Sequence, residues 1–131
     1  INSFATFWLM YPELNLVLPY PPSVNTYWGF RGSRRFLTAR AREFKALVAD
    51  EFRRSAHNGF AEARLAVKVG LCPPDKRVRD IDNIAKPLLD ALCQAGVFTD
   101  DGQIDLLVIE RLQVISGGCC KISIASRGYV I

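Results

Sequence analysis

Alternating hydrophobic and polar residues predict strands at both ends of the chain and in its middle. Residues 13–18 have leucine at every second position, Leu14, Leu16 and Leu18, all on one face, and residues 63–71 alternate in the same way. Both patterns are typical of half-buried strands. Residues 104–115 and 119–125 predict two further strands, and the Gly117-Gly118 pair between them predicts a hairpin. Residues 34–37 fit a shorter strand.

Helical spacing of apolar residues predicts two main helices. The first begins at Thr38, a suitable N-cap, and runs to about Ala56, after which Asn58 or Gly59 suits a left-handed cap. The second ends at Gly96 and carries an apolar stripe made of Ile81, Ile84, Ala85, Leu88, Leu89 and Leu92. Strands and helices in this order predict an α+β domain with a small mixed sheet.

The segment between the first strand and the first helix is rich in proline and aromatic residues. Prolines within residues 19–23 end the strand, because proline donates no ladder hydrogen bond. Residues 24–32 predict a loop, with the aromatic and amide side chains Asn25, Tyr27, Trp28 and Phe30. Its rings either cap the core or stack on nucleic acid.

Length and composition fit one globular domain. The chain has 131 residues, of which 50% are hydrophobic, enough to bury a core. Residues 1–11 are apolar but lack the basic segment and cleavage site of a signal peptide. We expect them to be an extension, either a cloning remnant or a truncated native arm, before a single domain over residues 12–131. No apolar run approaches the roughly 20 residues of a membrane span, so no membrane partner is expected.

The cysteines lack the spacing and histidine partners of a zinc site. We therefore expect free thiols in a reducing cytoplasm at Cys72, Cys93, Cys119 and Cys120.

Positive charge is concentrated in one stretch. Residues 31–54 hold 8 Lys/Arg and 3 acids, a net of +5, so that the remainder of the +4 chain nets −1. This concentration favours a polyanionic partner, although a solvated helix face would have a similar composition.

Acidic residues gather around the start of the second helix. Asp80 and Asp82 precede Lys86 and Asp90, and Asp100-Asp101 follows the helix. Carboxylate oxygens suit a hard cation such as Mg²⁺, which activates water and neutralises phosphate charge in phosphodiester hydrolysis. The alternative is a solvated face in which Asp80 or Asp82 caps the helix and Lys86 pairs with acids four residues away.

Helix length limits whether Asp101 can reach Asp80 within one chain. A regular helix from Asp82 to Ala95 rises about 20 Å, whereas the steps from Gly96 to Asp101 return at most about 17 Å. Pro87 favours the first turn of a helix. A helix that starts near Lys86 would therefore shorten the gap; otherwise Asp101 acts across a dimer interface.

Three segments resemble the RusA family of Holliday junction resolvases, which is common in bacteriophages and prophages. They are LPYPPSVN at residues 18–25, RDIDNIAKPLLDALCQAG at residues 79–96, and Asp100-Asp101. The resemblance implies a RusA-like fold in which a catalytic Mg²⁺, replaceable by Mn²⁺, is held by Asp80, Asp82 and Asp101, with Asp100 as a further candidate ligand. It also implies a functional lysine at Lys86 and a homodimer, since two symmetric nicks need two sites.

The predicted function is a structure-selective endonuclease that resolves four-way DNA junctions by paired nicks, in the cytoplasm of a bacterium or a phage-infected host. Predicted DNA-binding residues are Asn25, Arg31, Arg34, Arg35, Lys76, Arg77 and Arg79. The alternatives are a basic DNA-binding module without catalysis and a metal nuclease acting on other branched nucleic acids.

Overall fold

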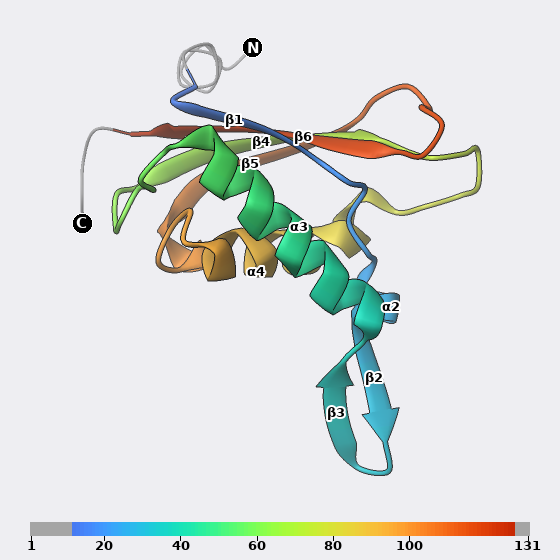
Figure 1. Ribbon diagram of the computed structural model, residues 1–131. Helices are drawn as coiled ribbons and strands as arrows, with labels where there is room; N and C mark the ends of the chain where they lie inside the picture. The colour runs from blue at the N-terminus through green and yellow to red at the C-terminus, as the bar shows by residue number, and fades with distance from the viewer. Residues whose placement is uncertain (1–11, 128–131) are drawn as a thin grey trace.

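A four-stranded sheet with two long helices on one face forms the body of the protein in the computed structural model (Figure 1), which describes residues 12–127. The strands are β1 (Leu14–Leu18), β2 (Trp28–Arg31), β3 (Arg34–Leu37), β4 (Leu65–Cys72), β5 (Ile104–Arg111) and β6 (Cys119–Ser126). The helices are α2 (Val24–Tyr27), α3 (Ala39–Ser55) and α4 (Ala85–Ala95), with 3₁₀ helices η1 (Ile81–Ile84) and η2 (Asp101–Gln103). The predicted α+β class and its mixed sheet are confirmed. The predicted extension over residues 1–11 lies outside the described residues.

The order of the strands corrects the predicted hairpin. The sheet runs β1-β6-β4-β5, with β6 antiparallel to both of its neighbours and β5 parallel to β4. The chain from β5 to β6 therefore passes over the end of β4, where the Leu112 N–H donates to Leu71 O at 2.7 Å and the Ile115 N–H to Pro73 O at 2.9 Å. Because β4 stops at Pro73, β5 also ends earlier than predicted, at Arg111.

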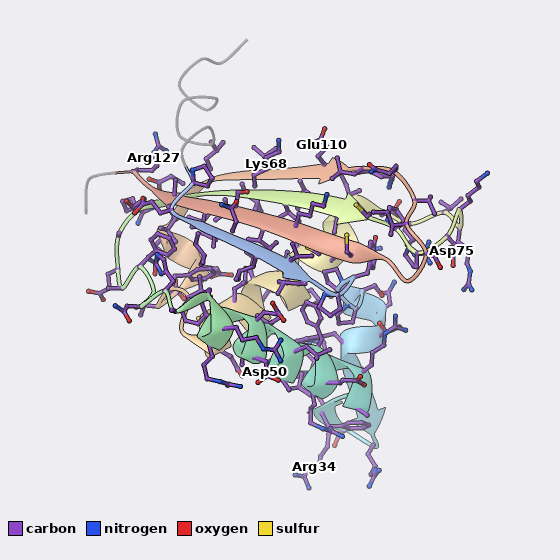
Figure 2. The ribbon with its side chains drawn as sticks, turned by 45° about the horizontal axis from the view of Figure 1, so that its top comes forward. Arg34, Asp50, Lys68, Asp75, Glu110 and Arg127 are labelled. Atoms are coloured by element: carbon purple, nitrogen blue, oxygen red, sulfur yellow. The ribbon has the colours of Figure 1, made fainter. Side chains whose placement is uncertain are left out.

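The core lies between the inner face of the sheet and the two long helices. In β1 the buried leucines alternate with exposed residues as predicted, and the inward residues of β4 are fully buried. Lys68 and Glu110 lie on the opposite sheet face, 3.7 Å apart between Nζ and Oε1 (Figure 2). No helix within residues 12–127 has the length and apolar character needed to cross a membrane.

Residues 24–32 form regular structure rather than the predicted loop. They begin with the short helix α2 and continue into β2, which pairs with β3 as a separate two-stranded sheet. Figure 1 shows this hairpin, residues 28–37, extending away from the body; we call it the arm. Tyr27 is fully buried, so that ring caps the core, whereas Phe30 is exposed. Stacking of a ring of this segment on nucleic acid stays a prediction.

Both ends of α3 are defined by caps. Thr38 caps its start as predicted, with Oγ1 accepting from the Ala41 N–H at 3.2 Å. The left-handed residue at its end is Ala56, with φ 59°, not Asn58 or Gly59. Gly59 serves a different contact: a Cβ there would lie 2.6 Å from Gly96 O. Glycine is therefore required for close packing of this turn against the end of α4.

The second predicted helix is shorter than a regular helix from Asp82 would be. Residues Ile81–Ile84 form η1, and the α-helix begins at Ala85. Pro87 therefore lies in the first turn, as expected for a helix that starts near Lys86. Gly96 ends α4 with φ 92°. The predicted stripe is largely buried, at Ile84, Leu88, Leu89 and Leu92.

Candidate active site

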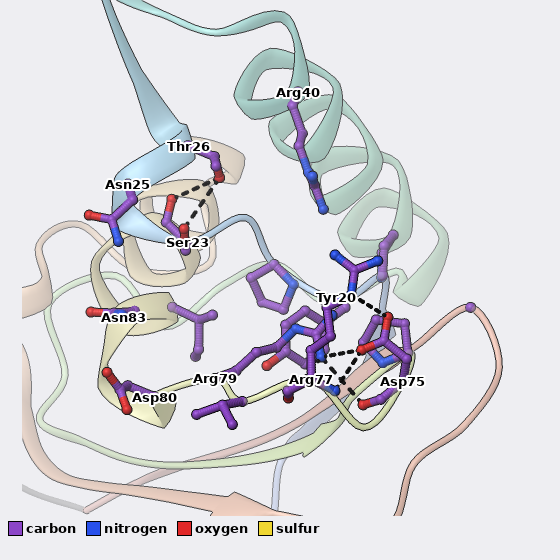
Figure 3. Close-up of a pocket in the computed structure, with 16 residues that line it drawn as sticks. Tyr20, Ser23, Asn25, Thr26, Arg40, Asp75, Arg77, Arg79, Asp80 and Asn83 are labelled. Carbon is purple, nitrogen blue, oxygen red and sulfur yellow. Dashed lines mark hydrogen bonds and ion pairs between the residues drawn. The ribbon is translucent and has the colours of Figure 1, made fainter.

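A groove of about 650 Å³ lies beside the start of η1 (Figure 3). The segment after β1, helix α2 and the loop after β4 all contribute to it. Of the predicted DNA-binding residues, Asn25, Arg77 and Arg79 line this groove, together with the predicted metal ligand Asp80. Arg40, which extends from α3 toward the groove, was part of the basic stretch but had no assigned role.

Arg79 is fixed by several neighbours. Its Nη1 donates to the Asp75 carboxylate at 2.7 Å, its guanidinium lies 5.8 Å from the centre of the Tyr20 ring, and its carbonyl accepts from Arg111. The hydrogen bond from Arg79, aided by the Arg77 N–H, lowers the pKa of Asp75 to about 2. Arg79 therefore organises the loop, while the exposed Lys76 and Arg77 remain accessible to phosphate. Lys76 lies on this loop but does not line the groove.

Asp80 and Asp82 are both exposed at the start of η1. Asp80 occupies the N-cap position but its side chain makes no capping hydrogen bond. Its carboxylate is therefore available to a ligand, and Asp80 does not cap the helix through its side chain as the alternative interpretation proposed. Asn83, which also lines the groove, bonds through its backbone N–H to Asp80 O at 3.3 Å.

Lys86 joins the start of α4 to the turn after its end. Its Nζ lies 3.2 Å from Asp90 Oδ1 and 3.5 Å from Asp101 Oδ2. The neighbouring Asp90 and then Asp101 raise the pKa of Lys86, which keeps the ammonium protonated. Asp82 was the other predicted partner of Lys86, but the ion pairs of Lys86 within residues 12–127 do not include it. Asp82 lies in the 3₁₀ helix η1, so it is not one α-helical turn from Lys86. Asp101 thus reaches Lys86 within one chain.

Asp90 also contacts the buried Tyr27 of α2. The Tyr27 hydroxyl donates to Asp90 Oδ2 at 3.4 Å. Burial, and then the charge and hydrogen bonding of Asp90, raise the pKa of Tyr27 to about 12. Asp90 therefore contacts both Tyr27 of α2 and Lys86. The residue spacing predicted the contact with Lys86 but not the one with Tyr27.

The turn that carries Asp101 is held by a residue that the sequence analysis missed. Gln103 is 6% exposed, and its Oε1 accepts from the Thr99 and Asp100 N–H groups at 3.0 and 2.9 Å. Its Nε2 donates to Ala61 O at 2.9 Å and to Ala63 O at 2.7 Å. Asp100 forms a capping box with Gln103, and its carboxylate also accepts from the Gly102 N–H at 2.8 Å. The Asp-x-x-Gln spacing of residues 100–103 was the available signal.

The acidic residues have the right chemistry for a hard cation, but the structure does not gather them into one cluster. Among residues 12–127, no three His, Cys, Asp or Glu side chains are placed to hold a metal ion. Mg²⁺ in nucleic-acid enzymes commonly binds one or two carboxylates and completes its shell with water and substrate phosphate. The exposed carboxylates of Asp80 and Asp82 fit that donor set, whereas that of Asp100 is engaged in the capping box.

The remaining predicted DNA contacts lie on the arm. Arg31, Arg34 and Arg35 line a hollow of about 310 Å³ together with Phe36. Figure 2 shows Arg34 at the far end of the arm, away from the sheet. The predicted residues therefore form two basic surfaces, one in the groove and one on the arm.

The groove residues fall within a stretch shared with known endonucleases. Residues 19–125 match the family described as Endodeoxyribonuclease RusA. The chain belongs to the RusA family. The RusA crossover junction endodeoxyribonuclease of Enterobacteria phage HK97 is 41% identical over 112 residues, covering 86% of this chain and 93% of the relative. That of Escherichia coli strain K12 is 32% identical over 118 residues, covering 87% and 95%. The predicted membership of the RusA family is confirmed.

Proposed function

We propose that the protein is a structure-selective DNA endonuclease that resolves Holliday junctions by paired symmetric nicks. The observation that carries the proposal is the Asp80 carboxylate, which is exposed and makes no capping hydrogen bond, in a groove that Arg40, Arg77 and Arg79 also line. Cationic side chains suit a polyanion, while the free Asp80 carboxylate within the same groove suits a divalent cation. The names of the phage and bacterial relatives support a crossover junction as the substrate.

Asp80, Asp82 and Asp101 are the proposed ligands of Mg²⁺, which Mn²⁺ can replace; because Asp101 pairs with Lys86 in this structure, its carboxylate would have to leave that pair to join Asp80 and Asp82 on the cation. When bound, the cation lowers the pKa of a water molecule at the site and neutralises charge on the attacked phosphate. Asp100 instead shapes the turn, since its carboxylate accepts the Gly102 N–H.

Lys86 and the arginines have distinct proposed roles around that site. The raised pKa of Lys86 keeps its ammonium charged, which suits stabilisation of negative charge developing on the phosphate rather than proton abstraction. The exposed Arg77 is suited to binding a flanking phosphate, while Arg79 positions the loop through Asp75.

Paired nicks require two active sites, and one chain offers one. We therefore propose that the functional unit is a twofold homodimer, in which each copy cuts one of two opposed strands. This activity would take place where junction DNA occurs, in the cytoplasm of a bacterium or a phage-infected cell.

Cleavage of a labelled four-way junction, compared with linear duplexes made from the same arms, tests the proposal. We expect paired nicks on the junction in Mg²⁺, none in chelator, and none with Asp80→Asn, which should still bind. Asp50→Asn is the matched control, because Asp50 lies on α3 in an exposed pair with Arg53. It should cut like the wild type.

Other outcomes would support different functions. Junction binding without metal-dependent cutting by the wild type would contradict catalysis and favour a basic DNA-binding module. Equal cutting of replication forks, flaps or RNA branches would favour a metal nuclease with a broader substrate range. Full activity of Asp80→Asn would remove that carboxylate from the site.

A further inference from the structure

The arm presents aromatic rings and arginines without any acidic residue. Residues 28–37 read WGFRGSRRFL, with three arginines and no Asp or Glu. The hairpin turns at Gly32, whose φ of +66° suits glycine. Figure 1 shows the arm projecting away from the sheet and the long helices. An element of this kind can enter a space that the rest of the molecule does not reach.

The register of the arm gives it two different faces. Phe30 pairs with Arg35 and Trp28 pairs with Leu37, so these four side chains share one face. On that face the Arg35 guanidinium lies 3.8 Å from the centre of the Trp28 ring, a close cation–π contact. The other face carries Phe36, with the Arg31 guanidinium 5.7 Å from its ring centre.

The two phenylalanine rings differ in how far they are covered. Phe36 packs against Gly29, where an added Cβ would lie 2.5 Å from the ring. Phe30 is 69% exposed and stands beside the stacked Arg35 and Trp28. Exposed apolar residues scattered singly are ordinary, but Phe30 and Phe36, which is 40% exposed, lie together on a hairpin whose only charged residues are arginines. The arrangement combines a planar surface for stacking with charges for phosphates.

We propose that Phe30 stacks on a nucleobase that is exposed where strands separate at a DNA branch, while Arg31, Arg34 and Arg35 hold the adjoining phosphates. In continuous duplex the faces of the bases are covered by their neighbours, whereas at a branch they become accessible. Aromatic stacking together with backbone charge is the usual way proteins hold unpaired strands. The arm would therefore contribute selectivity for branched over linear DNA. This inference rests on the proposed function for the substrate, but not on catalysis.

A second copy of this chain is the competing occupant of the arm. The chain carries a net charge of +4, and an arm without acids is poorly matched to a positively charged partner. Charge complementarity thus favours nucleic acid over self-association.

Binding measurements in chelator test the arm without any cutting. The ligands are a four-way junction with 2-aminopurine at the branch, a matched linear duplex and a single-stranded oligonucleotide. The variants are Phe30→Ala, the conservative Phe30→Trp, and Leu47→Ala as a control on an exposed apolar residue of α3. Thermal unfolding shows that each variant is folded.

We expect Phe30→Ala to weaken binding to the junction and the single strand by about 5- to 150-fold, the range found for one lost base stack. Its affinity for the duplex should stay within about twofold of wild type. Phe30→Trp should restore binding, and the 2-aminopurine signal should respond to wild type and Phe30→Trp but not to Phe30→Ala. Arg34→Ala should weaken binding to all three ligands. It should also lower the number of counterions released on binding, read from the salt dependence of the affinity, by about one.

Two results would overturn the stacking proposal. Unchanged junction and single-strand affinity of Phe30→Ala would show that the ring does not contact bases, even if the wild type cuts junctions as proposed. Loss of affinity that follows loss of a dimer in sedimentation would assign the arm to contact between copies. If the wild type fails to cut junctions, the proposed function is rejected. If Phe30→Ala nevertheless weakens single-strand binding, the stacking proposal still holds.

Discussion

Replacing Gln103 by leucine tests whether its buried amide positions Asp101. The substitution keeps the approximate size of the side chain but removes four hydrogen bonds, to the Thr99 and Asp100 N–H groups and to Ala61 O and Ala63 O. A typical net contribution of about 1 kcal/mol per bond gives about 4 kcal/mol. Thr99, Asp100 and Ala61 are exposed, so water can replace part of this. We therefore expect a loss of about 2–4 kcal/mol in the free energy of unfolding, or roughly 8–16 °C in Tm.

Urea denaturation measures this loss, and cleavage assays well below the Tm of the variant measure its effect on the site. Because Gln103 anchors the turn that brings Asp101 to Lys86, we expect kcat to fall more than junction affinity. Gln94→Leu is the control, since Gln94 is an exposed glutamine of α4, and its effect should stay within about 0.5 kcal/mol. A Gln103→Leu variant as stable and active as the control would refute the reasoning.

Three further predictions concern charge around the groove. Lys86→Ala should retain junction binding but lose about 10²–10³-fold in single-turnover cleavage; undiminished cutting would exclude Lys86 from the mechanism. Asp90→Asn should lower the pKa of Tyr27 from about 12, as followed by tyrosinate absorbance, and an unmoved titration would contradict the contact. Because the pKa of Tyr27 is raised, its contribution to the free energy of unfolding is complete below about pH 10 and is lost as the pH rises through about 12. In chelator, Asp80→Asn should bind junctions more tightly than wild type or Asp50→Asn, and equal affinities would contradict repulsion by Asp80.

Local sequence patterns predicted the elements whose signals are themselves local. The alternation of β1 and β4 and the Thr38 cap of α3 needed no knowledge of the rest of the fold. Pro87 correctly indicated that the α-helix begins close to Lys86. These features depend on spacing, proline stereochemistry and capping, which neighbouring residues determine.

Features that depend on distant pairing were harder to predict. The Gly117-Gly118 pair is a strong hairpin signal, yet β6 pairs with β1 and β4 rather than with β5. Nothing in residues 112–118 shows that the connection must pass over a strand from elsewhere in the sequence. Likewise, residues 34–37 were predicted as a short strand, but residues 28–31, with which they pair, were predicted as part of a loop.

Prediction of the candidate site followed the same division. Asp80 and Asp82, which their close spacing predicted as metal ligands, are both exposed, and their binding of a cation stays a prediction. The contact of Asp90 with Tyr27 joins residues 63 positions apart, so no local pattern could reveal it. Gln103 could have been found from its capping-box spacing with Asp100, but the four bonds that make it an anchor also depend on residues 61 and 63.

The ion pairs around the groove give a physical reason for coupling DNA engagement to a cation. Within residues 12–127, Arg79 pairs with Asp75, and Lys86 pairs with Asp90 and Asp101, whereas the ion pairs of this region do not include Asp80 or Asp82. A phosphate 4 Å from an unpaired carboxylate is repelled by about 1 kcal/mol in bulk water and by about 4 kcal/mol at an effective dielectric constant of 20. A divalent cation between the two changes that repulsion into attraction. The same aspartates would therefore weaken binding without metal and hold the phosphate with it.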